Sequence, residues 1–136
     1  MIQITKHSIN TQSVIDAATS LQAGAVNVFI GTVRNSANRK SVVRLEYEAY
    51  EAMAITEIKK IVDEAFCRWP LQGYAVSHRT GILTPGEVAV VVAISTPHRK
   101  ESFEACQFII DNLKEKAPIW KKEVFEDGEE WISTHP

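Results

Sequence analysis

Residues 95–122 read STPHRKESFEACQFIIDNLKEKAPIWKK, and this stretch says most about the fold and the function of the chain. We predict a long helix here, with Thr96 as the N-cap and Pro97 at the first helical position. The helix is expected to end at Ala117, because Pro118 cannot continue it. Two lysines follow directly after this stop.

The first turn of the expected helix carries His98 and Arg99. Free N–H groups at a helix N-terminus favour anions, and a guanidinium and an imidazole add to that preference. We therefore predict that His98 and Arg99 bind a phosphate or carboxylate group of a substrate.

Near its other end the helix carries Lys114, on one stripe with Phe103, Gln107 and Ile110. A lysine on a largely apolar stripe either extends its ammonium group to water or is partly buried with a lowered pKa. Extension is the commoner outcome, and the stripe alone leaves both open.

The distance between the two ends of the helix suggests a second chain. Arg99 and Lys114 are separated by about 22 Å along a helix that rises 1.5 Å per residue. Either they serve separate sites, or the helix of a second copy brings the missing half, which implies a homodimer.

The rest of the sequence predicts alternating strands and helices in one domain, residues 1–136. The order, with hairpin-like strand pairs, indicates an α+β sandwich and not a doubly wound parallel sheet. The expected elements are a strand at 2–7, a helix at 11–21, a buried strand at 25–33, a mobile loop at 34–40, a half-exposed strand at 42–47, a helix at 52–69 that buries Ile55, Ile58, Val62, Ala65 and Phe66, strands at 74–79 and 87–95, and a hairpin of 119–125 with 130–133.

Composition excludes several classes of protein. A net charge of −2 and a pI near 6.1 argue against a dedicated nucleic-acid binder. No apolar run reaches the length of about 20 residues that a membrane span needs, and the N-terminus lacks the apolar core of a signal peptide. Cys67 and Cys106 are isolated, so we expect buried thiols and no structural zinc. These observations predict a cytoplasmic protein.

Standard catalytic motifs, such as a phosphate-binding glycine loop, are absent from the sequence, which leaves cationic residues at the ends of elements as candidates. Arg34 follows a strand and is equally well explained as a binding residue or as the first polar residue of a loop. His78 and Arg79 also end a strand, where basic residues are more often solvated.

Several segments, taken together, resemble one known family. They are Gly31-Thr32-Val33-Arg34-Asn35, His78-Arg79, His98-Arg99, Phe103-Glu104-Ala105 with Gln107-Phe108-Ile109, and Leu113-Lys114 through Ala117-Pro118-Ile119-Trp120-Lys121-Lys122-Glu123. In this order and spacing they resemble the catalytic large subunit of molybdopterin synthase, from about residue 24 to residue 131. The most specific part is the His-Arg helix start followed by Lys-x-x-x-Pro-x-Trp-Lys.

The resemblance implies a sulfur-transfer reaction. Enzymes of this family convert cyclic pyranopterin monophosphate to molybdopterin by inserting two dithiolene sulfurs. The donor is a thiocarboxylate on the C-terminal Gly-Gly tail of a small ubiquitin-like subunit, and two copies of each subunit form a heterotetramer. The implied fold is an α/β hammerhead with an additional antiparallel β subdomain. No metal or cofactor is implied.

Carried onto this sequence, the resemblance makes Lys114 and Lys121 the catalytic candidates and Arg34, His98 and Arg99 the substrate-binding ones. The chain departs from the family where relatives continue with a basic tail, and there His135 aligns with an arginine.

Two other classes of function stay as alternatives. One is a non-catalytic module of the same fold that binds an anion or a peptide tail. The other is an RNA-binding protein that uses the lysine cluster, which net acidity and the lack of an aromatic platform disfavour.

Overall fold

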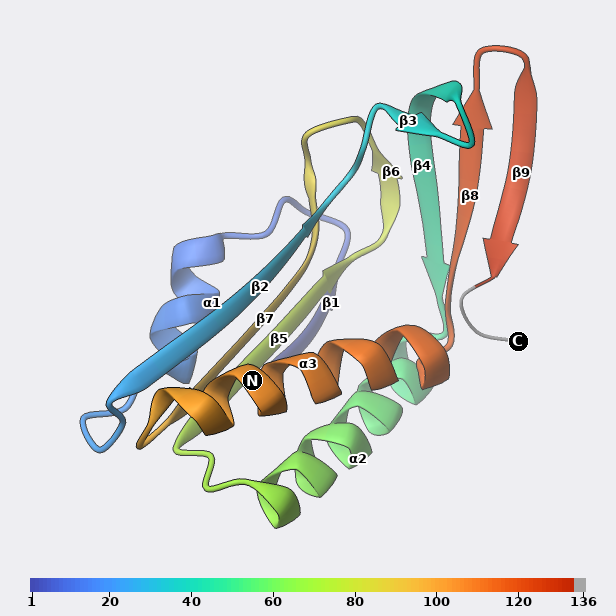
Figure 1. The fold of residues 1–136 in the computed structure, drawn as a ribbon. Coiled ribbons are helices and arrows are strands. Elements are labelled where there is room, and N and C mark those ends of the chain that lie inside the picture. The colour runs from blue at the N-terminus through green and yellow to red at the C-terminus, as the bar shows by residue number, and fades with distance from the viewer. Residues whose placement is uncertain (134–136) are drawn as a thin grey trace.

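The larger of two sheets is four-stranded and mixed (Figure 1). The computed structural model describes residues 1–133. Within them, β1 (Ile2–Thr5), β5 (Gly73–Arg79), β7 (Val88–Thr96) and β2 (Ala25–Thr32) lie side by side in the order β1-β5-β7-β2. β1 runs parallel to β5, and the other neighbours are antiparallel.

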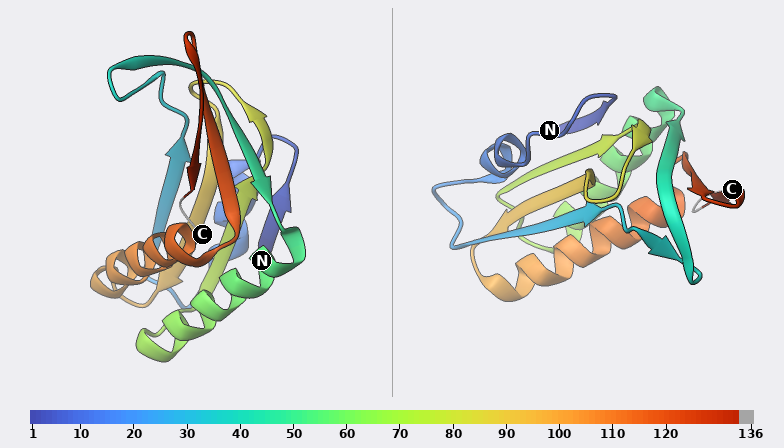
Figure 2. Two further views of the ribbon diagram at one scale, coloured as in Figure 1. Left: turned by 90° about the vertical axis from the view of Figure 1, so that its right-hand side faces the viewer. Right: turned by 90° about the horizontal axis from the view of Figure 1, so that it is seen from above.

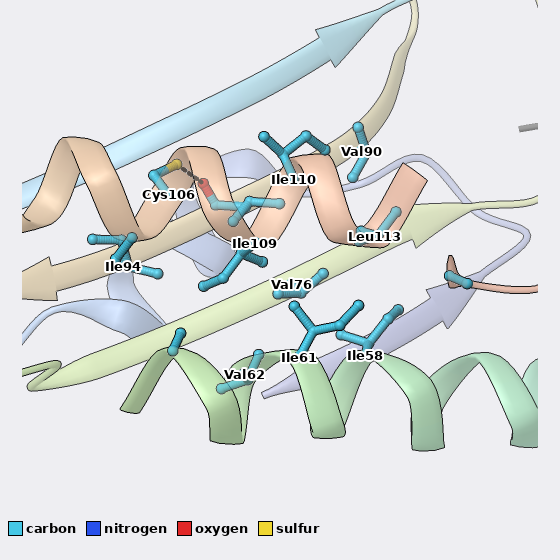
Figure 3. Packing of buried hydrophobic residues seen from close by; sticks show 14 of the residues in the cluster. Ile58, Ile61, Val62, Val76, Val90, Ile94, Cys106, Ile109, Ile110 and Leu113 are labelled. Atoms are coloured by element: carbon cyan, nitrogen blue, oxygen red, sulfur yellow. Dashed lines mark hydrogen bonds between the residues drawn. The ribbon is translucent and has the colours of Figure 1, made fainter. Parts of the chain in front are cut away.

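Helices cover both faces of this sheet. α1 (Thr11–Ala18) lies on one face, and α2 (Glu51–Arg68) and α3 (Arg99–Lys116) lie together on the other (Figure 1). Because successive side chains of a strand point to opposite faces, the buried strand β7 contributes to two separate apolar layers. The layer under α1 contains Val14, Ala18, Ala75, Val91 and Ala93. The layer under α2 and α3 includes Ile58, Val62, Val76, Val92, Ile94, Ile109 and Leu113 (Figure 3).

A second, antiparallel sheet extends from one end of the sandwich (Figure 2). Its main path is β3 (Ser36–Ala37), β4 (Lys40–Ala49), β8 (Ile119–Phe125) and β9 (Gly128–Ser133), and β6 (Gly81–Leu83) pairs with the other edge of β4. A small apolar cluster joins the two sheets, formed by Val33, Val42, Leu45, Leu83, Ala89 and Phe125. This arrangement confirms the predicted α+β class and its additional antiparallel unit.

The start of α3 differs from the prediction. Thr96 is still paired with Ala25 in the sheet, so the helix begins at Arg99 with His98 as its N-cap. The side chain of His98 makes no capping hydrogen bond, and the Thr96 hydroxyl donates to the His98 carbonyl at 2.6 Å. The predicted Thr-Pro start was wrong because the β-ladder holds this backbone in an extended conformation.

Strand β2 was predicted to be buried, but it lies at the edge of the main sheet. Among the described residues it pairs only with β7, and Val26 and Ile30 are 42% and 43% exposed. Its unbroken apolar sequence is typical of a central strand, so the edge position could not be read from composition.

Other boundaries and burials also differ. In α2 the buried face uses Ala54 and Ile61, while Ile55 and Phe66 are largely exposed. The expected loop at 34–40 contains the short hairpin of β3 with β4, whose turn residues have positive φ. Cys106 is buried as expected, but Cys67 is exposed.

Gly73 provides a test of the packing between α1 and the main sheet. A Cβ at this position would clash with the Ala18 carbonyl oxygen, which already accepts a hydrogen bond from the Ser95 hydroxyl at 2.6 Å. We expect Gly73→Ala to lower the free energy of unfolding by about 3 kcal/mol, because backbone must move. Gly81→Ala is the control: its Cβ meets no atom within 4 Å, so only the positive φ costs about 1 kcal/mol. Urea titrations that gave equal losses would contradict this account.

Candidate functional site

A pocket of about 260 Å³ lies where the C-terminal end of α3 meets both sheets. Three cationic side chains line it: Arg34 follows β2, Lys114 is in the last turn of α3, and Lys121 is on β8. Its other lining residues include Gly31, Tyr47, His78, Val90, Ile110, Leu113, Ile119 and Glu123. The structure thus brings three of the five predicted site residues around one cavity.

Lys121 is held in the pocket by strand pairing. It lies opposite Tyr47 in the β4–β8 ladder, and Glu123, two residues on, points to the same face. Burial lowers the pKa of Lys121, and the charges of Lys114 and Arg34 lower it further, whereas Glu123 acts in the opposite direction. Lys121 is therefore an amine whose charged form the pocket disfavours.

Lys114 is an exposed residue whose side chain lines the pocket. Of the other residues on its predicted stripe, Ile110 is buried, whereas Gln107 is exposed and Phe103 is 63% exposed. The stripe is therefore much less buried than its sequence suggested. Of the two alternatives, extension toward open space matches the structure.

Arg34 is placed by the way β2 ends. The β2–β7 register shifts between Gly31 and Thr32, and the Val33 N–H then donates to the Glu87 carbonyl at 3.0 Å. A Cβ on Gly31 would lie 2.7 Å from the Val90 side chain, so this close approach requires glycine. The fixed strand end brings Arg34 to the pocket lining.

His98 and Arg99 do not reach this pocket. Both are exposed at the opposite end of α3, about 22 Å along the helix from Lys114. Within one chain the structure therefore separates the predicted anion site from the lysines. Their role in substrate binding stays a prediction.

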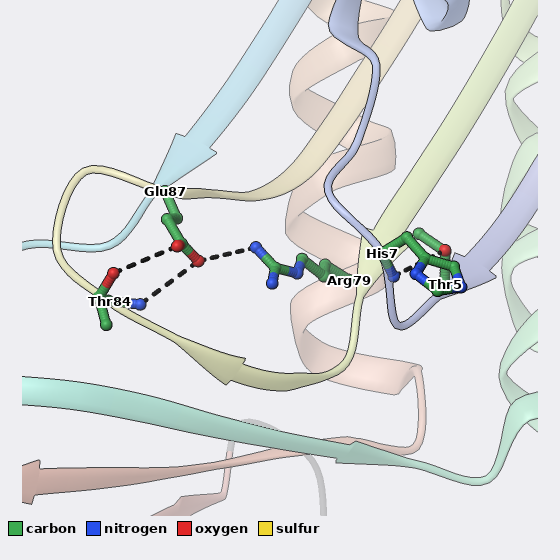
Figure 4. Close-up of polar contacts among 5 residues, drawn as sticks. All are labelled: Thr5, His7, Arg79, Thr84 and Glu87. Carbon is green, nitrogen blue, oxygen red and sulfur yellow. Dashed lines mark hydrogen bonds and ion pairs between the residues drawn. The ribbon is translucent and has the colours of Figure 1, made fainter.

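The pair at the end of β5 is not solvated, contrary to expectation. His78 is 5% exposed and lines the pocket. Arg79 donates to the Glu87 carboxylate at 2.7 Å, and Thr84 donates to the same carboxylate, which closes the loop between β6 and β7 (Figure 4). The two neighbours thus face different surroundings, one in the pocket and one in this loop.

Sequence reasoning missed two titratable pocket residues, Tyr47 and Glu123, and favoured a solvated position for His78. Burial and the nearby Glu123 raise the pKa of Tyr47 to about 12, so its hydroxyl keeps its proton. Glu123 is 8% exposed, and among the described residues its Oε2 has no hydrogen-bond partner. Glu123 lies two residues after Lys121 on a predicted strand, so both side chains are expected on the same face. This spacing was the one sequence signal for Glu123.

His78 should make stability depend on pH. Burial lowers its pKa to about 4, against 6.5 for a free histidine. Between these values the unfolded chain binds a proton that the native chain does not, so stability falls as the pH falls. From pH 7 to pH 5 we expect a loss of about 2 kcal/mol from this residue.

The measurement is urea unfolding of the wild type and of His78→Gln at both pH values. Every other titratable group is present in both proteins, so the difference between the two changes in stability isolates His78. Equal changes would contradict the buried neutral imidazole.

The described residues contain neither a metal-binding cluster nor a membrane-spanning helix. No cluster of three or more His, Cys, Asp or Glu side chains could hold a metal ion there. No helix within the described part of the chain is long and apolar enough to cross a membrane. A cytoplasmic location stays a prediction.

Comparisons with known proteins agree on one family. A family model described as MoaE protein matches residues 4–116. The molybdopterin synthase catalytic subunit of Bacillus subtilis is 49% identical over 130 residues, covering 96% of this chain and 83% of that one. The crystal structure of molybdopterin synthase from Staphylococcus aureus superimposes with a TM-score of 0.91 at 39% identity, covering 95% of this chain and 94% of that one.

A complex of subunits 1 and 2 of the molybdopterin-converting factor from Helicobacter pylori contains a chain of the same fold. The TM-score is 0.80 at 24% identity, covering 99% of this chain and 93% of that chain.

Proposed function

This chain belongs to the MoaE protein family, and we propose that it is the catalytic subunit of a molybdopterin synthase. In this reaction cyclic pyranopterin monophosphate receives two sulfurs and becomes the dithiolene molybdopterin. The observation that carries the proposal is that Arg34, Lys114 and Lys121 line one pocket. Three cations around one small cavity suit anionic reactants, and Lys121 is an amine with a lowered pKa.

The sulfur donor in this proposal is the thiocarboxylated C-terminal tail of a small ubiquitin-like subunit. A thiocarboxylate is an anion, and a Gly-Gly tail is thin enough to enter a pocket between two sheets. Lys121 binds the thiocarboxylate or an acyl intermediate, because its desolvated ammonium group gains most from an anionic partner.

Lys114 is the proposed central catalytic residue. Sulfur transfer needs a polarised carbonyl and protons moved to and from the pterin side chain. Lys114 and Lys121 line the same pocket, but Lys114 belongs to α3 and Lys121 to β8. The two ammonium groups can therefore approach a reacting group from different directions. Arg34, which also lines the pocket, adds a third positive charge for the substrate.

The proposed assembly is a homodimer within a heterotetramer of two large and two small subunits. His98 and Arg99 cannot reach the pocket of their own chain, so in the proposed dimer they hold the substrate phosphate in the pocket of the partner. The exposed apolar side chains of Phe103, Val26 and Ile30 are consistent with a covered surface in the assembly.

The decisive experiment incubates the purified chain with the pterin phosphate and the thiocarboxylated small subunit, and assays dithiolene formation. The control uses the same small subunit with an ordinary C-terminal carboxylate, which binds but carries no sulfur. Product only with the thiocarboxylate supports the enzyme. Tight binding of both forms without any product would instead favour the non-catalytic tail-binding module.

A further inference from the structure

His78 lies on the wall of the pocket and has no part in the roles assigned so far. It belongs to β5, is 5% exposed, and packs edge-on against Tyr47 of β4, with ring centroids 5.1 Å apart and an interplanar angle of 72°. Two strands from different sheets therefore fix the plane of the imidazole. A side chain held in this way can present a ring nitrogen in a defined direction.

The hydrogen bonding of the ring sets its tautomer. Nδ1 lies 2.8 Å from the Arg79 carbonyl oxygen, which can only accept, so Nδ1 carries the proton. In a neutral imidazole Nε2 is then an acceptor. Among the described residues Nε2 has no hydrogen-bond partner, although the residue lines the cavity. This acceptor on the pocket wall is therefore open to a donor group inside the cavity.

The surroundings keep this ring neutral. The charged or titratable groups that line the same pocket are Arg34 after β2, Tyr47 on β4, Lys114 on α3, and Lys121 and Glu123 on β8. Burial is the main cause of the lowered pKa of His78, and the charge of Lys114 lowers it further. Nε2 is thus a neutral acceptor on the wall of a pocket that Lys114 also lines.

We propose that His78 is a positioning residue: Nε2 accepts a hydrogen bond from the Lys114 ammonium group and fixes its direction in the pocket. Lys114 is an exposed lysine at a helix end, and its four-carbon arm samples many rotamers. A fixed acceptor restricts these rotamers to those that point into the cavity. The consequence for catalysis rests on the proposed function, whereas the contact itself does not.

A structural role alone makes a different prediction. The bond from Nδ1 to the Arg79 carbonyl holds the end of β5, and any donor at that position would do the same. Asparagine places an amide near Nδ1, whereas glutamine places one near Nε2. The pair His78→Asn and His78→Gln therefore separates anchoring of the strand from presentation of an acceptor.

The first measurement is steady-state dithiolene formation by the complex with the thiocarboxylated small subunit. We expect His78→Asn to lower kcat by about tenfold or more, the size expected for one lost hydrogen bond to a charged group, with little change in KM. His78→Gln should recover most of the rate. If His78→Asn kept the wild-type rate, the Nε2 acceptor would be dispensable and the proposal would fail.

The second measurement needs no activity. In ¹⁵N NMR of the histidine rings, Nε2 of His78 should be unprotonated from about pH 5.5 to pH 8. Lys114→Ala should shift its resonance, whereas Lys116→Ala should not. No shift in Lys114→Ala would overturn the contact. If wild-type protein formed no dithiolene, the proposed function would fail, and this spectrum would still decide the inference about His78.

Discussion

Lys114→Ala should abolish dithiolene formation while the small subunit still binds. Lys114 lies in the last turn of α3 and lines the pocket, and the proposed reaction needs an amine there to move protons. We expect a loss of at least about a hundredfold in kcat, within the usual range for removal of an acid/base group. Single-turnover assays with saturating substrate measure the chemical step, and titration with the small subunit measures binding.

Three variants make this result specific. Lys116→Ala removes a lysine from the same turn that does not line the pocket, so it should retain wild-type activity. Lys114→Arg keeps the charge, but a guanidinium does not give up a proton in proteins, so it should stay inactive. Lys121→Ala should reduce both binding and rate. Near-normal turnover of Lys114→Ala would move the catalytic role to another residue.

The cationic part of the site could be predicted from the sequence because it depends on local signals. Pro118 ends the helix, and the chain turns back into β8, which brings Lys121 toward the last turn that carries Lys114. Arg34 directly follows a recognisable strand. The combination of these segments also matched a family, and the matching relatives bear out that resemblance.

The remaining pocket residues could not be predicted, because pairing between distant strands places them there. Tyr47 faces Lys121 only through the β4–β8 register, which joins residues seventy or more positions apart in the chain. His78 belongs to a strand end whose sequence looks solvated, and it is buried by Tyr47 from the other sheet. No periodicity within a single element contains such information.

The same limit explains the errors in the fold. Thr96 and Pro97 have the composition of a helix start, but the ladder with β2 holds Thr96 in the sheet. The β2 sequence is as apolar as that of a central strand, yet the topology leaves it at an edge. In both places a tertiary contact overrode a correct local preference.

The separation of Arg99 from Lys114 leads to the second large effect that we expect. The structure places Arg99 in the first turn and Lys114 in the last turn of one continuous helix, so no bending of a loop can bring them together. If the active site needs both, the second must come from another copy of the chain. Each homodimer would then contain two pockets, each built from the lysines of one chain and the Arg99 of the other.

Arg99→Ala and Lys114→Ala should therefore each be inactive alone but partly active when mixed. In a mixed dimer, one pocket combines both substitutions and the other has neither. Random reassortment of equal amounts makes half of the dimers mixed, so we expect about one quarter of the wild-type activity. Differently tagged chains, co-expressed and purified through both tags, provide mixed dimers with about half of the wild-type activity. Purified mixed dimers without activity would show that Arg99 and Lys114 do not serve one shared site.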